Sequence, residues 1–474
     1  MNRNIIKTAG SALVMLLIGS QCAFGAQEPQ FFPVSQDGFI GDTMPFADGD
    51  EMHIFYLNDQ RNGTIGFHPW NQVSTADFVN FRDIGEVLPV VHNEYDRDLA
   101  LGTGSVIKKD DVYYAFYTAH NGNIEPKEVI RMATSTDINA NGWEKSREFM
   151  LNPPKGYELN DFRDPYVLFN ESEGRYWMLL TARKDNHGVI LYMKSDDLLD
   201  WTEPQILYKN ETNRSNMECP TLISYNGFWY LSYSEQEPNR IVKYLVSESP
   251  GGQFESFDIN YFDGAGFYAG RIEEFRGKLY IIGWTPSKAN STDSGSIDWA
   301  GNLVAHGLRQ GANGQLFPVS IPERSGSCAN KRVLGNFGLS SAGYQFKTME
   351  PLKERMILKG KMRYDASANG YFGFGFNHAG AENNINVVFD INKNQIRFYH
   401  CPLKEAKVPE SKVAYALRQH SEIDFELVVD DSVFVLYVNG EIALTARNYN
   451  GIQRNWSVFS NDCRVSGENF TVLY

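Results

Sequence analysis

Five short segments rich in aromatic and aliphatic residues recur along the N-terminal part of this chain. Each follows a polar turn, such as Asp48-Gly49-Asp50 or Tyr225-Asn226-Gly227, and another strand-like run precedes that turn. β-branched and aromatic residues favour strands, and a tight polar turn between two such runs predicts a β-hairpin. The chain therefore repeats one hairpin. Its five copies contain the strands His53–Leu57, Tyr113–Tyr117, Tyr176–Leu180, Trp229–Tyr233 and Leu279–Gly283.

The spacing of these strands predicts how the hairpins assemble. They begin at residues 53, 113, 176, 229 and 279, so the repeat is about 50 to 63 residues long. Repeats of this length are typical of propellers and solenoids. Closing similar sheets into a ring protects their edges from pairing with other chains. We expect an all-β protein whose first domain, residues 26–320, is a five-bladed β-propeller.

A second all-β domain is expected after the repeats. A stretch containing proline, serine and glycine runs from Pro318 to about Asn330 and is interpreted as a linker. Hydrophobic alternation then resumes in Tyr371–Phe376 and Val433–Val438, and Asn439-Gly440 is a strong hairpin signal. These features predict a β-sandwich over residues 331–474, packed against the propeller.

The first 25 residues have the pattern of a secretory signal peptide. Arg3 and Lys7 form a basic start, an apolar core covers residues 12–18, and Ala23-Phe24-Gly25 supplies small residues for cleavage. The apolar run is too short to span a bilayer. We expect a secreted or periplasmic protein. Lipid attachment at Cys22 is the less favoured alternative, because Gln21 replaces the small residue expected before it.

Charge and cysteine usage narrow the class of partner. Without the signal segment the net charge falls from −14 to −16, which disfavours nucleic acid and anionic lipid as partners and suits a neutral ligand such as a carbohydrate. Four cysteines remain, without the spacing of a zinc site or a disulfide scaffold. His53, His92 and His120 are scattered and expected to be structural or exposed, so neither metal nor cofactor is expected. No further apolar segment could span a membrane, and the oligomeric state carries no sequence signal.

The repeat also predicts where the chemistry lies. A short polar segment precedes each hairpin, and in a propeller the first strand of each blade lines the central channel, so these segments should converge on one axial pocket. Three of them carry a carboxylate, and acids that share a pocket repel one another and shift their pKa values. The segments are Gly41-Asp42-Thr43, Gly102-Thr103-Gly104, Arg163-Asp164-Pro165, Met217-Glu218-Cys219 and Phe267-Tyr268-Ala269.

Paired carboxylates in a pocket rich in aromatic residues are typical of enzymes that cleave glycosidic bonds. Glu218 lies between the apolar residues Met217 and Cys219, which suits a protonated acid. Asp42 lies in a more polar setting that suits an anionic nucleophile. Asp164, beside Arg163, should be held ionised and bind hydroxyls or stabilise positive charge on the sugar.

Several motifs resemble glycoside hydrolase family 32, the β-fructosidases. Arg163-Asp164-Pro165 and Glu218-Cys219-Pro220 match that family's Arg-Asp-Pro and Glu-Cys-Pro motifs, and Trp70 to Ser74, Phe267-Tyr268-Ala269 and Gly283-Trp284 are similar to further segments. The resemblance implies a retaining mechanism with Asp42 as nucleophile, Asp164 as transition-state stabiliser and Glu218 as acid/base. Substrate-binding residues are then expected to be Arg163, Trp70, Thr103, Tyr268 and Trp284.

The chain departs from the family pattern around the terminal sugar. Gly41-Asp42-Thr43 stands where the family has Asn-Asp-Pro, Leu57 replaces a glutamine and Gly102 replaces a phenylalanine. Furanoside cleavage, most simply of β-fructosides in oligo- or polysaccharides, is the expected activity, with sucrose a poor substrate. Two alternatives stay open: an inverting enzyme similar to glycoside hydrolase family 43 that acts on arabinose or xylose polymers, and a sugar-binding propeller without turnover.

Overall fold

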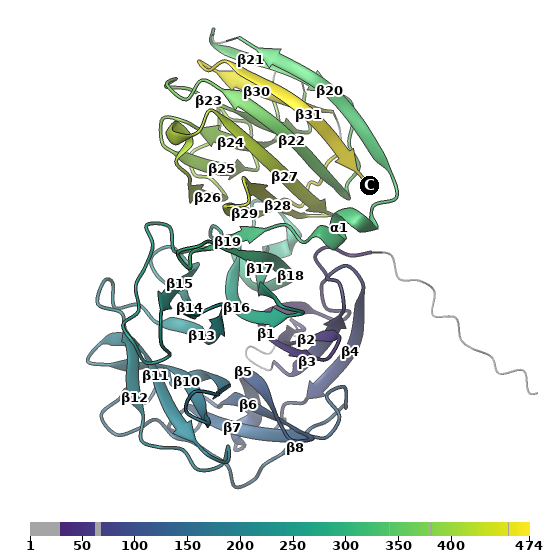
Figure 1. Ribbon diagram of the computed structural model, residues 1–474. Coiled ribbons are helices and arrows are strands. Elements are labelled where there is room, and N and C mark those ends of the chain that lie inside the picture. The colour runs from purple at the N-terminus through teal and green to yellow at the C-terminus, as the bar shows by residue number, and fades with distance from the viewer. Residues whose placement is uncertain (1–28, 62–67, 341, 380–381, 454) are drawn as a thin grey trace, which may run out of the picture.

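The computed structural model describes residues 29–61, 68–340, 342–379, 382–453 and 455–474. The expected signal segment and Cys22 lie outside the described residues. The chain forms two β-structures, a propeller followed by a sandwich, and Figure 1 shows them stacked one above the other. Within the described residues no helix is both long and apolar enough to cross a membrane.

The propeller has five antiparallel blades, as the repeat predicts. In each blade the second strand carries the repeated aromatic motif. The first blade consists of β1 (Phe39–Asp48), β2 (Glu51–Asp59), β3 (Trp70–Thr75) and β4 (Phe81–Leu88), and the second of β5 (Ala100–Lys109), β6 (Val112–His120), β7 (Glu128–Ser135) and β8 (Glu144–Lys145). The third consists of β9 (Arg163–Asn170), β10 (Arg175–Lys184), β11 (His187–Ser195) and β12 (Gln205–Lys209), and the fourth of β13 (Met217–Tyr225), β14 (Phe228–Glu235) and β15 (Ile241–Ser247). The fifth consists of β16 (Tyr268–Phe275), β17 (Lys278–Lys288), β18 (Ile297–Gln310) and β19 (Leu316–Val319).

Two details differ from a ring of identical four-stranded sheets. The fourth blade has three strands, and isolated bridges from β15 to Glu255 and Tyr261 cover its outer edge. The first and fifth blades are joined by a bridge between Ile40 of β1 and Gly301 of β18. This bridge closes the ring and places β18 beside the start of β1, close to Asp42.

The C-terminal sandwich consists of two antiparallel six-stranded sheets around an apolar core. Asn439 and Gly440 form the expected hairpin turn, with φ of 53° and 60°. One sheet has the order β20 (Lys331–Leu339), β31 (Val465–Leu473), β22 (Met356–Tyr364), β27 (Glu422–Asp430), β28 (Val433–Val438) and β29 (Ile442–Arg447). The other has the order β21 (Tyr344–Met349), β30 (Trp456–Asn461), β23 (Tyr371–Phe376), β24 (Ile385–Asp390), β25 (Gln395–Tyr399) and β26 (Ser411–Ala414).

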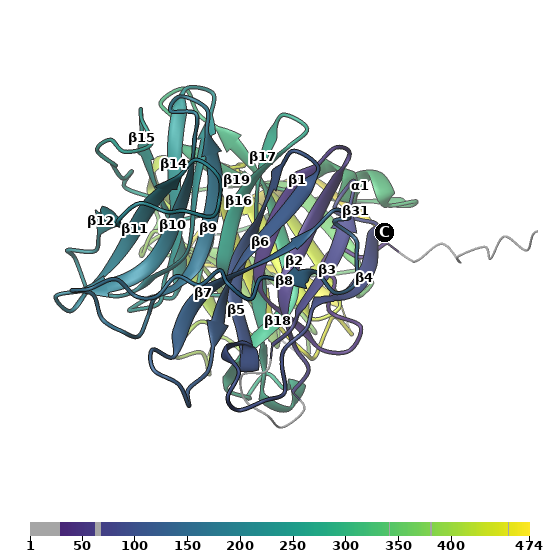
Figure 2. The ribbon, with the colours of Figure 1, turned by 90° about the horizontal axis from the view of Figure 1, so that it is seen from below.

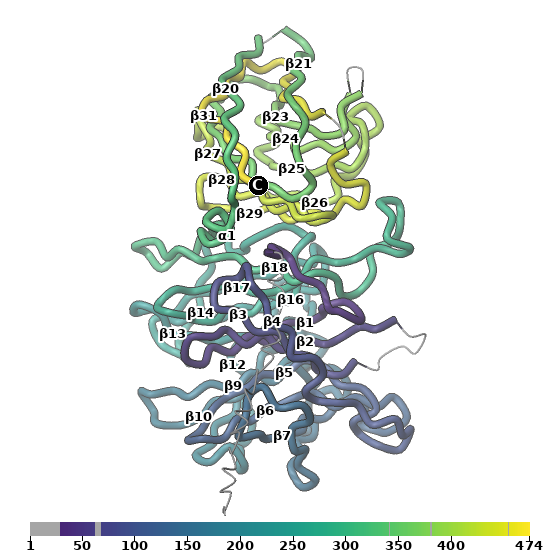
Figure 3. Tube along the Cα trace, turned by 90° about the vertical axis from the view of Figure 1, so that its right-hand side faces the viewer, coloured from purple at the N-terminus to yellow at the C-terminus, as the bar shows by residue number. Residues whose placement is uncertain are grey.

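Buried polar contacts fasten the sandwich to the propeller. Between β19 and β20 the chain forms the one-turn helix α1 (Pro322–Ser327) at the junction seen in Figure 3. Arg447 of β29 is 4% exposed and donates to the carbonyl of Pro286 and to Oδ1 of Asn302, each at 2.6 Å. Seen from below, in Figure 2, the propeller strands lie in front of the yellow and green sandwich strands. The sandwich therefore packs on the fifth blade rather than on the far blades.

Candidate active site

A backbone irregularity recurs at the same place in the inner strand of every blade. The register between the first and second strand shifts between Gly41 and Met44, between Leu101 and Gly104, and at the corresponding points of β9, β13 and β16. Such bulges bend a strand and re-aim side chains. Asp42, Asp164, Cys219 and Ala269 occupy the bulges with positive φ values of 30°, 59°, 52° and 50°. The five bulges turn these segments toward the axis.

The register corrects one detail of the sequence interpretation. Asp42 and Asp164 occupy equivalent positions, but the residue of β13 at that position is Cys219. Glu218 instead aligns with Arg163 and with Tyr268. Its carboxylate therefore approaches the pocket from one residue earlier along its strand, and the pocket gathers acids from two positions of the repeat.

Asp42 is held between two neighbouring blades. Its Oδ2 accepts a hydrogen bond of 2.8 Å from the Thr103 hydroxyl of β5, and its Oδ1 accepts one of 3.1 Å from the indole nitrogen of Trp284 of β17. Burial raises the pKa of Asp42, and these two donors oppose that rise. The polar setting expected from its neighbours in sequence is supplied by these two donors of other blades: Asp42 is half-buried, and its ionised form depends on them.

Asp164 is buried in the floor of the pocket, with 3% of its surface exposed. Its Oδ2 accepts a hydrogen bond of 2.9 Å from the backbone N–H of Cys219, and Arg163 lies 3.9 Å away. Burial raises the pKa of Asp164 to about 6, although the Arg163 charge lowers it. Arg163 favours the ionised form as expected, but the loss of water outweighs the neighbouring cation, so Asp164 becomes mostly ionised only above about pH 6.

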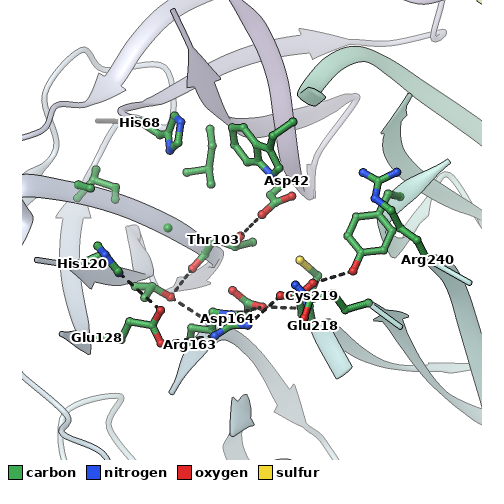
Figure 4. Close-up of a pocket in the computed structure, with 18 residues that line it drawn as sticks. Asp42, His68, Thr103, His120, Glu128, Arg163, Asp164, Glu218, Cys219 and Arg240 are labelled. Atoms are coloured by element: carbon green, nitrogen blue, oxygen red, sulfur yellow. Dashed lines mark hydrogen bonds and ion pairs between the residues drawn. The ribbon is translucent and has the colours of Figure 1, made fainter. Parts of the chain in front are cut away.

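Both carboxylate oxygens of Glu218 accept hydrogen bonds. Its Oε1 accepts a hydrogen bond of 2.8 Å from Arg163, and its Oε2 accepts one of 2.7 Å from the phenol of Tyr268. Arg163 also contacts Asp161 at 2.5 Å and Glu128 at 3.5 Å, so one guanidinium organises the acids of blades two, three and four. Figure 4 shows Arg163 beside Glu128, Asp164 and Glu218, with Asp42 above them.

These groups line a pocket of about 380 Å³ at the axis of the propeller. Six of the eight residues proposed from the sequence reach it: Asp42, Thr103, Arg163, Asp164, Glu218 and Tyr268. The other two are tryptophans without exposed surface. Trp70 lies in the core between the first two blades and donates to the carbonyl of Gly102 at 2.9 Å, so it supports the pocket wall instead of lining it. Trp284 acts on the pocket through Asp42.

The pocket also contains residues that the sequence did not assign to the site. Glu128, Gln236, Arg240 and Trp299 were not expected there, and His68 and His120 were interpreted as residues without a role in the site. His120 was expected to be structural or exposed, yet it lies on the wall, 3.6 Å from Glu128. The guanidinium of Arg240 lies 4.3 Å from the ring centre of Tyr268 and 5.0 Å from that of Trp284. These residues come from loops and outer strands, where the repeat has no motif to mark them.

The arrangement offers acid, base and cation in one small space. Three carboxylates with different partners can hold different protonation states at one pH, as proton transfer to a leaving group requires. Among the described residues, no group of three or more histidine, cysteine, aspartate or glutamate side chains is placed to hold a metal ion. Burial raises the pKa of the Cys219 thiol far above its usual value, so this thiol stays protonated.

Comparison with known families identifies the propeller. A model of the "Glycosyl hydrolases family 32 N-terminal domain" matches residues 36–306, which include all three acids. The chain belongs to glycoside hydrolase family 32. The Arg-Asp-Pro and Glu-Cys-Pro segments of this family 32 chain therefore lie at the bulges of the third and fourth blades.

Curated relatives of this family 32 chain include two sucrose-6-phosphate hydrolases. That of Bacillus subtilis (strain 168) is 26% identical over 259 residues, 49% of this chain and 51% of that protein. That of Vibrio alginolyticus is 24% identical over 318 residues, 62% of this chain and 63% of that protein. The chain thus spans about half the length of the curated relatives it matches.

Solved structures share the whole architecture. Fructan 1-exohydrolase IIa from Cichorium intybus has a TM-score of 0.73 at 16% identity, covering 94% of this chain and 96% of that one. Exo-inulinase from Aspergillus awamori has a TM-score of 0.71 at 17% identity, covering 94% and 99%. At such identities the likeness shows the fold: a five-bladed propeller followed by a sandwich.

Proposed function

We propose that this protein is a glycoside hydrolase that cleaves β-fructofuranosidic bonds in oligo- or polysaccharides with retention of configuration. The observation that carries the proposal is the convergence of Asp42, Asp164 and Glu218, from three blades, on one pocket of about 380 Å³. The names of the relatives support fructose as the sugar, since they describe a fructan exohydrolase, an exo-inulinase and sucrose-6-phosphate hydrolases.

Each acid has a role that its contacts favour. Glu218, when protonated, gives its proton to the leaving oxygen while a carboxylate oxygen of Asp42 attacks the anomeric carbon and the glycosidic bond breaks. In the second half, Glu218 takes a proton from water, the water oxygen bonds to the anomeric carbon, and Asp42 is released. Arg163 donates a hydrogen bond to Oε1 of Glu218 and so holds this carboxyl group in place for both steps. Asp164, buried below, stabilises the positive charge that develops on the sugar.

The departures from the family pattern bear on the choice of substrate. Leu57 and Gly102 both line the pocket, where they replace an amide that hydrogen-bonds and an aromatic wall. A site that loses a buried hydrogen bond to substrate loses discrimination by large factors. We therefore propose that sucrose is a poor substrate compared with a fructan or a related furanoside.

A substrate screen tests the proposed function. Purified protein is incubated with sucrose, inulin, levan and arabinan, and reducing sugar is measured. Turnover of inulin or levan well above that of sucrose, lost in Asp42→Ala, supports the proposal. Release of sugar from arabinan alone would favour an arabinan-cleaving enzyme. Binding of fructans without turnover would favour a sugar-binding propeller.

The place of action is a proposal that follows from residues 1–25. Their basic start, short apolar core and small residues before Ala26 support export of the mature chain. Fractionation of expressing cells, with mass spectrometry of the mature N-terminus, should find Ala26 first in the exported form. Retention of Met1 in the cytoplasm would refute export.

A further inference from the structure

Gly41 and Trp299 fit together at the edge of the pocket. A Cβ atom added at Gly41 would lie 2.3 Å from Cη2 and 2.6 Å from Cζ2 of the Trp299 indole. Real Cβ atoms do not approach other atoms so closely, so any side chain at position 41 must displace the ring. The backbone does not demand glycine here, since Gly41 is absent from the residues with positive φ. Space for the indole is therefore the reason for the glycine.

The indole of Trp299 is placed to meet a sugar beside the candidate nucleophile. Trp299 is half-buried, lines the pocket and stands in β18, which the bridge between Ile40 and Gly301 holds against β1. Its ring lies 4.6 Å from that of His68 and 5.9 Å from that of Trp284, measured between centres. Trp284 in turn donates to Asp42.

The backbone of Trp299 is fixed as firmly as its ring. Its carbonyl accepts a hydrogen bond of 2.9 Å from Arg61, and its N–H donates to Oδ1 of Asp298 at 3.0 Å. Arg61 also pairs with Asp298 at 3.2 Å. A residue whose backbone and ring already have fixed neighbours loses little conformational freedom when a ligand packs on it, which favours tight binding.

We propose that Trp299 is a substrate-binding residue: its indole forms a platform for the sugar at the bond to be cleaved, and Gly41 is kept small to seat it. Aromatic faces bind the C–H faces of sugars through dispersion and hydrophobic contact. The family pattern has asparagine at position 41, and here an apolar ring fills that space instead of an amide. The preferred glycoside is accordingly one whose first sugar presents a C–H face there. The inference rests on the proposed function.

Substitution of Trp299 separates binding from chemistry. Trp299→Ala should raise KM roughly tenfold or more while kcat stays within about threefold, and Trp299→Phe should fall between it and the wild type. Trp229→Ala removes a half-buried tryptophan from the fourth blade, outside this pocket, and should leave both constants unchanged. Thermal melting of all three variants identifies any that fail to fold. An unchanged KM in a folded Trp299→Ala protein would overturn the proposal.

A double-mutant cycle with Gly41→Ala tests the fit directly. The added methyl should displace the indole, so Gly41→Ala alone should weaken binding about as much as Trp299→Ala, and adding it to Trp299→Ala should cost little more. If Gly41→Ala weakened binding equally in the wild type and in the Trp299→Ala protein, the proposed packing of Trp299 against Gly41 would be contradicted. Calorimetric binding of fructo-oligosaccharide, measured in parallel, tests the platform independently of turnover. A wild type that binds without turnover would refute the proposed function, and a Trp299→Ala protein that binds equally well would refute the platform.

Discussion

Arg163 donates a hydrogen bond of 2.8 Å to Oε1 of Glu218, so a cation of the third blade positions the candidate acid/base of the fourth. Arg163→Lys keeps the charge but loses the planar fork that also reaches Asp161 and Glu128. We expect kcat/KM to fall by about 10²-fold, mainly in kcat, because the acid is no longer held against the leaving oxygen. Steady-state kinetics on the best fructan checks this.

The matched control for that change is Arg175→Lys. Arg175 forms a similar contact of 2.7 Å with Asp196, but on the outer surface of the propeller. Its replacement should leave kcat/KM within about twofold, since exposed ion pairs contribute little. Equal effects of the two substitutions would show that Arg163 has no special role in the site.

Thr103→Val should move the acidic side of the pH profile. The lost hydroxyl donates to Oδ2 of Asp42 and opposes the rise in pKa that burial causes, so its removal should raise the pKa of Asp42 further. The nucleophile must be ionised, so the acid limb of the pH profile of kcat/KM should move to higher pH. Thr221→Val is the control, because no described group hydrogen-bonds the buried Thr221 hydroxyl. An unshifted limb would contradict the proposed role of Asp42.

Asp164→Asn should change how stability depends on pH. The pKa of Asp164 is about 6, above its ordinary 3.8, so between these values the folded protein keeps a proton that the unfolded chain has lost. Stability from this group is therefore present below about pH 4 and lost as pH rises to about 6. Asparagine carries no charge, so the variant should gain on the wild type, by on the order of 2–3 kcal/mol, from pH 4 to pH 7. Melting curves across this range should show that the difference in stability between the variant and the wild type grows with pH. A difference that stays constant would contradict the raised pKa of Asp164.

Arg447→Met should loosen the junction between propeller and sandwich. The side chain is 4% exposed and donates to Pro286 and Asn302 of the propeller, so its loss leaves buried acceptors without a partner. We expect the free energy of unfolding to fall by about 2–4 kcal/mol. Arg309→Met, which removes an exposed arginine bonded to the carbonyl of Gly440 at the same junction, should cost less than about 1 kcal/mol. Equal losses in the two variants would show that burial of Arg447 is not what matters.

Much of the fold was predictable because short sequence patterns determine its strands and turns. Alternating aromatic strands with polar turns repeat with each blade, and Asn439-Gly440 marks a hairpin in the sandwich. The acids were predictable for the same reason, since each stands near the start of the first strand of its hairpin. Register was harder to predict. A bulge leaves no residue signature, so the one-residue offset of Glu218 appears only when the strands are paired.

The remainder of the pocket depends on contacts between distant parts of the chain. Trp299 meets Gly41 across more than half the sequence, and Arg240 reaches Tyr268 from a loop. No period or motif connects such pairs. The low polarity expected around Glu218 from its sequence neighbours was also misleading, because its environment is set by Arg163 and Tyr268 of other blades. Neighbours in space, not in sequence, decide the electrostatics of this site.

The anomeric configuration of the first-formed product tests the central claim most directly. NMR spectra recorded in the first minutes of fructan hydrolysis, before mutarotation, distinguish the two anomers. A covalent intermediate on Asp42 predicts that β-fructofuranose appears first, with the configuration of the substrate, and that Asp42→Ala forms none. Early appearance of the inverted anomer would contradict Asp42 as nucleophile, because it would mean that water attacks the sugar directly.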